Sequence, residues 1–515
     1  MEKAQSSSDR LSIAIVLSLL LISSLVFSYQ TRHGQHWSGW KASVLRTWRE
    51  AGYWTVAGKP VTNPGGVHAG DAQEIYAGYR AYSLLPLYWT YLLTNDLSVA
   101  LVVLYFLLVP VLVLTIWWFL GKGPWALLIG SLFCLSPGYL RSTVMDWDPV
   151  AATMLLGIPF ILALVNVVGS PPRHRAVTVA VIIAVAVYAQ IEWATFFDLG
   201  VGWAACALLL WPTRRRQLGL LTVFIICLTI SSAVVLLLQK SGGGSGVAGK
   251  LSAYTIGAGG YDQHGMSWST AVRRIGVASA VGLLPLWAVF FFVAIPVLWK
   301  TPRQGVIACL PLVAAGMEIC ALRNDMANHQ WIPIPVEALG IILSLYFLRR
   351  GASPGAPALA NLPRHSSLSF PAIPWLTAGS ILYTLVVLLA FRASGAETHA
   401  LISLVDTHTP RHAIVFIGPD LEHLVASKDL GGIIDRKILP MDTPIGSNRQ
   451  NASGGEAYVL NSAPLSDVGP LVAQSTTVKG DAATALVTWY RQTITHKTYH
   501  VERAGTFYLY KLHGD

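Results

Sequence analysis

Residues 97–120 read LSVALVVLYFLLVPVLVLTIWWFL, an apolar run without a single charged side chain. A helix needs about 20 such residues to cross the hydrocarbon core of a bilayer. Similar runs recur along the chain, and only 12% of its 515 residues are charged, against about 25% in an average soluble domain. The sequence therefore predicts a polytopic α-helical membrane protein.

Together, the apolar runs along the chain predict about 11 transmembrane helices. The first run has no small-residue cleavage site and is interpreted as a retained anchor. The expected spans lie near 11–29, 97–120, 124–140, 150–168, 176–190, 197–212, 218–238, 278–299, 305–322, 331–348 and 373–391.

The loops between these spans carry an orientation signal. Every second loop is basic, and together with the N-terminal tail these loops hold thirteen Lys and Arg residues against only Glu2 and Asp9. Because short cytoplasmic loops are enriched in Lys and Arg, we expect a cytoplasmic N-terminus and, after eleven spans, an extracytoplasmic C-terminus. The basic residues of the predicted cytoplasmic face account for the net charge of +10. The charge therefore does not indicate nucleic-acid binding.

Two domains are expected. Residues 1–393 form the transmembrane domain, with a long first outer loop at 30–96 and a Gly/Ser-rich, mobile outer loop at 239–277. Residues 394–515 are predicted to form a small extracytoplasmic α/β domain. Its strands are expected at 412–417, 456–460 and 506–512, and its helix at 481–495.

Most acidic residues outside this C-terminal domain fall in the predicted outer loops. Asp71 and Glu74 lie in the first loop, Asp146 and Asp148 in the second, and Glu192 and Asp198 flank the third. Outer loops are wet, so a lone acid there, such as Asp71, Glu192 or Asp198, is more simply a solvated side chain. These acidic residues nevertheless all fall on the predicted outer side of the membrane, which indicates a candidate site that faces outward at the membrane surface.

The pair Asp146-Trp147-Asp148 stands directly before Pro149, which can open a helix. Hard carboxylate oxygens make this pair a candidate ligand set for a divalent cation, Mg²⁺ or Mn²⁺, and Asp148 can alternatively orient an acceptor nucleophile. The competing interpretation is that Asp148 only caps the following helix.

Arg141 and Arg323 each stand at the outer end of a span, and His329 shares a short loop with Arg323. Guanidinium groups bind phosphate in a bidentate manner, although an Arg at this depth also reaches the headgroups without any specific role. Two acids inside spans, Glu318 and Glu337, are further candidates, because ionisable groups at such depths are costly.

The run Ser136-Pro-Gly-Tyr-Leu-Arg-Ser-Thr143, followed by Asp146-Trp-Asp148, resembles the second outer loop of oligosaccharyltransferase catalytic subunits. In that family a similar run precedes an acidic pair that helps to bind a divalent metal. The long first outer loop, the odd number of spans and the outer C-terminal domain resemble the GT-C superfamily of membrane glycosyltransferases.

Two departures limit what the resemblance implies. Residues 394–515 lack the Trp-Trp-Asp motif of oligosaccharyltransferases, which argues against peptide glycosylation. GT-C members usually place an acid early in the first outer loop, where this chain has His33-Gly-Gln-His36 and no acid before Glu50. Asp71, Glu74 or His36 are the candidates for that role, and if none fills it the chain is an inactive relative.

The resemblance implies an inverting transfer of a sugar from a polyprenyl-phosphate sugar or lipid-linked oligosaccharide to a glycan, lipid or protein acceptor. Asp71, Glu74 or Asp148 would act on the acceptor, and Arg141, Arg323 and His329 would bind the donor phosphate. Such a donor needs no nucleotide cofactor. The expected location is a bacterial-type plasma membrane, in contact with membrane lipids and without a nucleic-acid partner.

Two other classes of function remain as alternatives. A non-catalytic GT-C-like assembly subunit would use the outer domain to bind partners, and its acids would not converge on one cavity. A lipid or solute transporter would show repeated halves and helices broken near mid-membrane, and no internal repeat is evident in the sequence.

Overall fold

The computed structural model describes part of the chain in detail. These residues are 13–23, 39–56, 58, 81–121, 123–145, 149–170, 172, 174–192, 195–211, 214–240, 268–321, 333–350, 372–392, 401, 403–405, 407–410, 413–417, 437–440, 457–461, 501–504 and 507–512. The chain divides into two units, one of residues 1–29 and 77–388 and one of residues 30–76 and 389–515.

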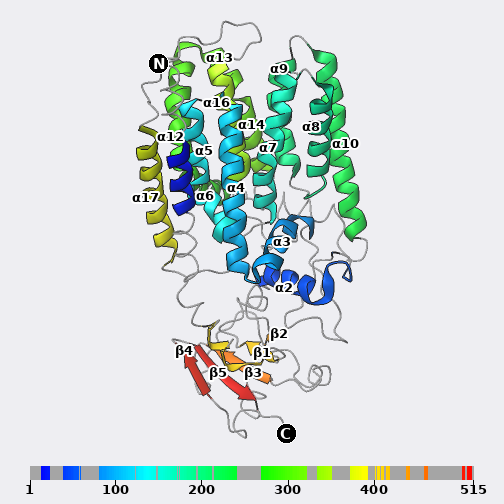
Figure 1. Ribbon diagram of the computed structural model, residues 1–515, viewed down its shortest axis with the longest axis vertical. Coiled ribbons are helices and arrows are strands. Elements are labelled where there is room, and N and C mark those ends of the chain that lie inside the picture. The colour runs from blue at the N-terminus through cyan, green and yellow to red at the C-terminus, as the bar shows by residue number, and fades with distance from the viewer. Residues whose placement is uncertain are drawn as a thin grey trace. The chain divides into compact units, whose positions relative to one another are not determined.

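The first unit is a bundle of apolar helices (Figure 1). A helix over Ile13–Ser23 opens it. The remaining helices are η2 (Ala81–Leu84), α3 (Leu85–Thr94), α4 (Leu97–Phe119), α5 (Pro124–Cys134), α6 (Pro137–Leu140), η3 (Arg141–Met145), α7 (Pro149–Gly169), α8 (Arg175–Tyr188), α9 (Thr195–Leu210), α10 (Arg215–Lys240), α12 (Trp268–Lys300), α13 (Pro302–Ala308), α14 (Leu310–Ala321), α16 (Pro333–Arg350) and α17 (Ala372–Arg392).

The uncharged run 97–120 forms α4. Asp96 caps this helix by accepting a hydrogen bond from the backbone N–H of Val99 at 2.9 Å, and Asn95 ends α3 in the left-handed region with φ 55°. Asn tolerates this conformation better than most residues. The turn between α3 and α4 therefore follows directly from the Asn-Asp pair.

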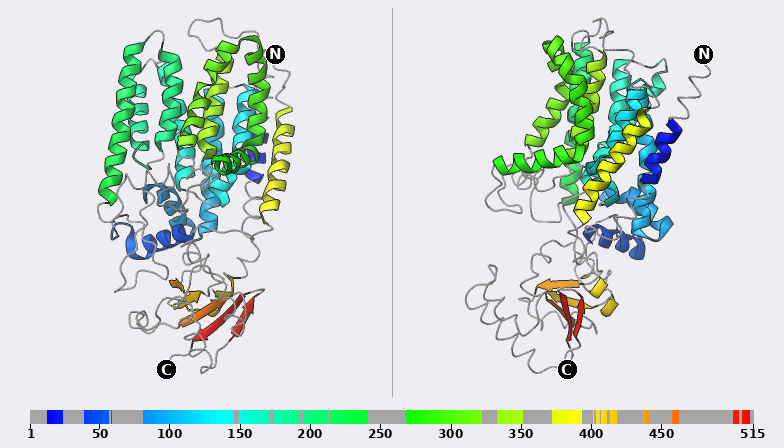
Figure 2. Two further views of the ribbon diagram at one scale, coloured as in Figure 1. Left: turned by 180° about the vertical axis from the view of Figure 1, so that it is seen from behind. Right: turned by 90° about the vertical axis from the view of Figure 1, so that its left-hand side faces the viewer.

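α16 is the central helix of the bundle. Every residue from Pro333 to Leu348 is buried, and the helix packs against α7, α9, α12 and α14. A helix that is apolar on all sides is either enclosed by other helices or faces lipid, and α16 is enclosed. In contrast, α10 and α17 lie at opposite edges of the unit (Figures 1 and 2).

A described helix lies within or across each of the eleven predicted spans. By length and composition, however, only four helices of the described residues qualify as spans, or five if α13 and α14, bent by 52°, are counted as one. The shorter helices include α8 with 14 residues and α9 with 16. Multiple membrane-spanning helices are confirmed, and the number eleven stays a prediction.

The second unit contains α2 (Gly39–Thr47), a π-helical turn η1 (Trp48–Gly52) and a five-stranded sheet. The strands are β1 (Ile414–Ile417), β2 (Lys437–Pro440), β3 (Ala457–Asn461), β4 (Val501–Ala504) and β5 (Phe507–Leu512), in the order β2-β1-β3-β5-β4. β1 pairs in parallel with β2 and β3, and β5 pairs antiparallel with β3 and β4.

The sheet buries one apolar cluster. Val415 of β1, Leu460 of β3 and Leu509 of β5 pack with Leu404 and Val405, which precede the first strand. Three of the five strands occupy their predicted positions, while the short strands β2 and β4 were missed. The helix predicted at 481–495 lies outside the described residues, so the α/β composition of this domain and its boundary at 393/394 stay predictions.

Candidate functional site

The segment that carries the resemblance, residues 136–145, forms a tightly capped turn of helix. The hydroxyl of Ser136 accepts a hydrogen bond from the backbone N–H of Tyr139 at 3.3 Å, and Pro137 occupies the first helical turn. At the other end, Ser142 and Thr143 donate to the carbonyls of Gly138 and Tyr139 at 2.9 and 2.8 Å. The polar residues of the motif thus hold α6 and η3 together as one unit.

Two other helices secure the junction between α5 and α6. The last carbonyls of a helix have no partner within it, and here two of them accept hydrogen bonds from side chains. Tyr105 of α4 donates to the Cys134 carbonyl at 3.2 Å, and Thr384 of α17 donates to the Leu135 carbonyl. The position of α6 therefore depends on α4 and α17 as well as on its own sequence.

α6 also lies directly against the start of α16. A Cβ added at Gly138 would come within 2.8 Å of Ile334, so only glycine permits this approach. Ile334 lies in the first turn of α16. The structure therefore brings the start of α16 next to the segment that carries Arg141.

Arg141 is the only charged residue of the described segment 136–145. Residues 136–140 and 142–143 are all buried, whereas Arg141 is half-buried. Tyr139 is fully buried, and its ring lies 5.7 Å from Tyr105 and 5.3 Å from Phe133. Arg141 is therefore a half-buried cation on a buried, capped segment, and its role as a phosphate-binding residue stays a prediction.

The remaining predicted site residues are not among those that the structure describes. They are Asp71, Glu74, Asp146, Asp148, Arg323 and His329, together with the alternative His36. Their roles stay predictions. Across the described part of the chain, no group of three or more His, Cys, Asp or Glu side chains is arranged to hold a metal ion.

One expectation about the outer-loop acids is wrong. Glu192 and Asp198 were expected to be solvated, but both are fully buried. Asp198 lies in the first turn of α9 rather than in a loop, and Glu192 follows the end of α8. The hydroxyl of Tyr188 donates a hydrogen bond to one carboxylate oxygen of Asp198, and the other oxygen is buried without a partner in the described structure.

Glu318 and Glu337 lie inside α14 and α16, as the sequence indicated. Glu337 accepts hydrogen bonds from Ser279 and from the Trp287 indole N–H, the latter at 2.9 Å, and both donors belong to α12. A Cβ at Gly200 of α9 would overlap a carboxylate oxygen of Glu318, so glycine leaves the space that this side chain occupies. These contacts assign packing roles that the sequence alone did not reveal.

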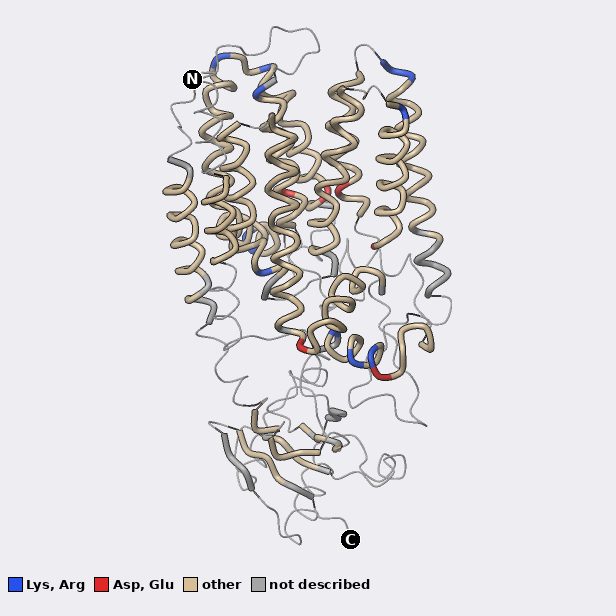
Figure 3. The backbone as a smooth tube through the Cα atoms, in the orientation of Figure 1, with Lys and Arg blue, Asp and Glu red and all other residues tan. Residues whose placement is uncertain are grey.

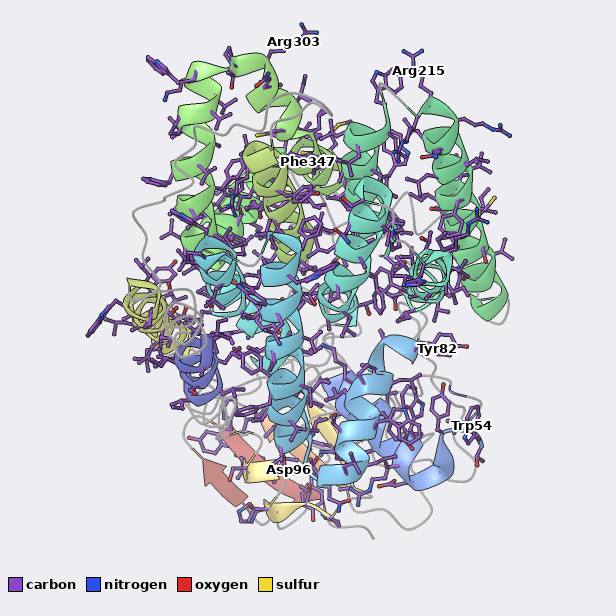
Figure 4. All side chains as sticks on the ribbon, turned by 45° about the horizontal axis from the view of Figure 1, so that its top comes forward. Trp54, Tyr82, Asp96, Arg215, Arg303 and Phe347 are labelled. Atoms are coloured by element: carbon purple, nitrogen blue, oxygen red, sulfur yellow. The ribbon has the colours of Figure 1, made fainter. Side chains whose placement is uncertain are left out.

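Charges are sorted between the two ends of the helical unit. Figure 3 shows most of the blue Lys and Arg segments of the bundle at one end, while red segments lie part way along the helices. Arg215 and Arg303 lie at this basic end, and Tyr82 and Asp96 lie at the opposite end (Figure 4). The separation agrees with the predicted sidedness, and which end faces the cytoplasm stays a prediction.

Comparisons with known proteins add a structural likeness. No family model matches the sequence, and no curated protein matches it. A solved structure does match: the crystal structure of ArnT from Cupriavidus metallidurans bound to undecaprenyl phosphate. Its TM-score is 0.57 at 13% sequence identity, over 97% of this chain and 97% of that one. The chain therefore has the fold of the ArnT structure.

Proposed function

We propose that this protein transfers a sugar from a polyprenyl-phosphate donor to an acceptor at the outer face of a membrane. The observation that carries the proposal is the likeness to ArnT over nearly the whole of both chains, because that structure contains undecaprenyl phosphate. The placement of Arg141, a half-buried cation on a buried and capped segment, supplies a group suited to a lipid phosphate.

In the proposed reaction, an acceptor oxygen attacks the anomeric carbon of the donor sugar, and the bond from that carbon to the phosphate oxygen breaks. Negative charge accumulates on the departing polyprenyl phosphate, and Arg141 stabilises it together with Arg323 and His329. Fixed donors aimed at developing charge contribute more in a water-poor site than in bulk water. The inversion of the anomeric centre follows from attack opposite to the departing phosphate.

The proton of the acceptor hydroxyl passes to a carboxylate, for which Asp148, Asp71 and Glu74 are the candidates. Asp146 and Asp148 are the candidate ligands of Mg²⁺ or Mn²⁺, which would offset the phosphate charge. The donor carries its own leaving group, so the proposed reaction needs no nucleotide. The proposed setting is a bacterial-type plasma membrane with the N-terminus in the cytoplasm.

Transfer by the purified protein in proteoliposomes tests the proposal. A panel of polyprenyl-phosphate sugars with a radiolabelled sugar is offered together with glycan and lipid extracts as acceptors. Arg141→Ala should lower the transfer rate about 100-fold, the scale of losing one donor to developing charge. Arg303→Ala, at the basic end of the bundle (Figure 4), is the matched control and should transfer at the wild-type rate.

Two results would count against the proposal. Equal rates for Arg141→Ala and the wild type would remove Arg141 from the site. A wild-type protein that binds polyprenyl phosphate but transfers no sugar from the panel would favour the assembly-subunit alternative. Asp148→Asn tests this position, because a base or a metal ligand there predicts a comparable loss, whereas an unchanged rate would leave Asp71 and Glu74 as the candidate bases.

A further inference from the structure

An apolar groove lies between α5, α12 and α17, and its lining includes none of the residues assigned to the transfer reaction. It encloses about 340 Å³, and its lining is aliphatic or aromatic except for Ser380. The Ser380 hydroxyl donates to the Leu376 carbonyl within its own helix at 3.0 Å, so it offers no free donor. The groove is therefore suited to a hydrocarbon ligand and not to a polar one.

The sequence of α12 forms this groove. Pro285 has no N–H, so the carbonyl of Val281 loses its partner in the helix. Tyr383 of α17 donates to that carbonyl at 3.0 Å, which fixes α17 beside α12 at the point where the groove begins. Ala288 is small and leaves the space open, and the ring of Phe292 stacks on Trp125 at 6.1 Å.

The groove is open at the surface of the helix bundle. Phe292 is 69% exposed and Leu376 is 44% exposed, and Ala288 is exposed as well. An apolar cavity of this kind does not hold ordered water. In a membrane, its occupant is a hydrocarbon chain.

The helices that line the groove also meet the segment that carries Arg141. α12 contacts α6 directly, and Thr384 of α17 bonds to Leu135 at the end of α5. α5 itself runs from Trp125 in the groove toward Arg141, and its 11 residues cover about 17 Å at 1.5 Å per residue. A long chain whose phosphate lies at Arg141 can therefore follow α5 into the groove.

We propose that this groove holds part of the isoprenoid tail of the donor lipid and so selects donors by chain length. The proposal rests on the proposed function, since it takes the lipid phosphate to lie at Arg141. An undecaprenyl tail is long enough to reach from a phosphate at Arg141 into the groove, whereas the much shorter farnesyl tail is not expected to fill it. The affinity of the protein for the donor lipid would then depend on the isoprenoid tail, which takes no part in the reaction.

Binding of two lipid phosphates of different length tests the groove. Undecaprenyl phosphate and farnesyl phosphate, which share a headgroup, are titrated into the purified protein and followed by native mass spectrometry. Ala288→Phe fills the groove from an exposed position and should weaken undecaprenyl phosphate binding at least about tenfold, the loss expected when roughly two methylenes leave apolar contact. Farnesyl phosphate binding should not change.

Ala280→Phe is the matched control, because Ala280 is also exposed on α12 but does not line the groove. It should leave both affinities unchanged. An Ala288→Phe variant that binds undecaprenyl phosphate like the wild type would overturn the proposal and leave the groove to phospholipid chains. Equal weakening of both lipids would also overturn it, since the tail would then not be the part recognised.

The failure of the proposed function gives a different result. If Arg141→Ala binds farnesyl phosphate as well as the wild type does, the headgroup assignment fails. A chain-length preference that Ala288→Phe abolishes would still support the groove in that case. The two variants therefore test the headgroup and the tail separately.

Discussion

Tyr188 is the described donor to a carboxylate in the middle of the bundle. Asp198 is fully buried, and one of its oxygens accepts from the Tyr188 hydroxyl. Tyr188→Phe removes this donor with little change in shape and leaves the carboxyl group without a partner. We expect the free energy of unfolding to fall by about 1–3 kcal/mol, the usual cost of a buried polar group left unsatisfied.

Thermal unfolding in detergent, followed by tryptophan fluorescence, measures this loss. Tyr82→Phe is the control, because Tyr82 is 43% exposed and its loss should change stability by less than about 0.5 kcal/mol. The same melting temperature for Tyr188→Phe and Tyr82→Phe would show that Asp198 does not depend on the bond.

Gly200 is a second residue whose role is steric. A methyl group there would overlap an oxygen of Glu318, so Gly200→Ala should destabilise the protein by about 1–3 kcal/mol through overpacking. Shortening the opposing side chain in Gly200→Ala/Glu318→Ala should recover part of the loss, which is the coupling expected of residues in contact. The comparison is made by thermal unfolding of the single and double variants.

Gly316→Ala on α14 serves as the control for this pair, because a Cβ at Gly316 meets no atom within 4 Å. It should be neutral or slightly stabilising, since alanine restricts the unfolded chain. Additive losses in the Gly200 and Glu318 variants would contradict the assigned contact.

Single residues were the hardest part of the structure to predict. The motif around Arg141 was found because its Pro-Gly-Tyr and Arg-Ser pairs are contiguous in the sequence. Tyr188, Thr384 and Ser279 act through partners 10, 249 and 58 residues away. No local pattern marks such pairs, and Asp198 was therefore mistaken for a solvated acid.

At the scale of helices, α17 is attached to the candidate site by one side chain. Thr384→Val keeps the shape of the side chain but removes the donor to the Leu135 carbonyl. We expect a loss of about 1–3 kcal/mol in unfolding free energy and weaker binding of polyprenyl phosphate, because Leu135 directly precedes the segment with Arg141. Unfolding and lipid titration of the same preparation measure both effects.

Thr229→Val is the control for this helix contact, since the exposed Thr229 hydroxyl bonds only to the Ile225 carbonyl of its own helix. It should leave both readouts near the wild-type values. A Thr384→Val protein that melts early but binds lipid normally would show that α17 stabilises the fold without positioning the site.

Helices were more predictable than their lengths. Apolar runs locate a helix because every residue in a span must satisfy its backbone within the helix, and each predicted run contains one. An apolar run does not show where its helix ends. α8 and α9, for example, are only 14 and 16 residues long. In the second unit, the apolar strands β1, β3 and β5 were predicted, while β2 and β4, with the four-residue sequences KILP and VERA that carry charged residues, were not.

At the scale of the whole molecule, the predicted orientation can be measured directly. The five native cysteines are replaced and single cysteines are introduced at Arg303 or at Asp96, which lie at opposite ends of the bundle (Figure 4). A membrane-impermeant maleimide should label position 96 in intact cells and position 303 only after permeabilisation, as the basic inner loops require. Labelling in the reverse order would invert the topology and remove the outer-face site.

The central claim is that a polyprenyl lipid binds with its phosphate at Arg141 and its tail along α5. An experimental structure of the full chain in a nanodisc with undecaprenyl phosphate tests it most directly. We expect phosphate density within hydrogen-bonding distance of the Arg141 guanidinium, continuous with density for the tail in the groove between α5, α12 and α17. Phosphate density at the basic end beside Arg215 and Arg303, with none at Arg141, would contradict it.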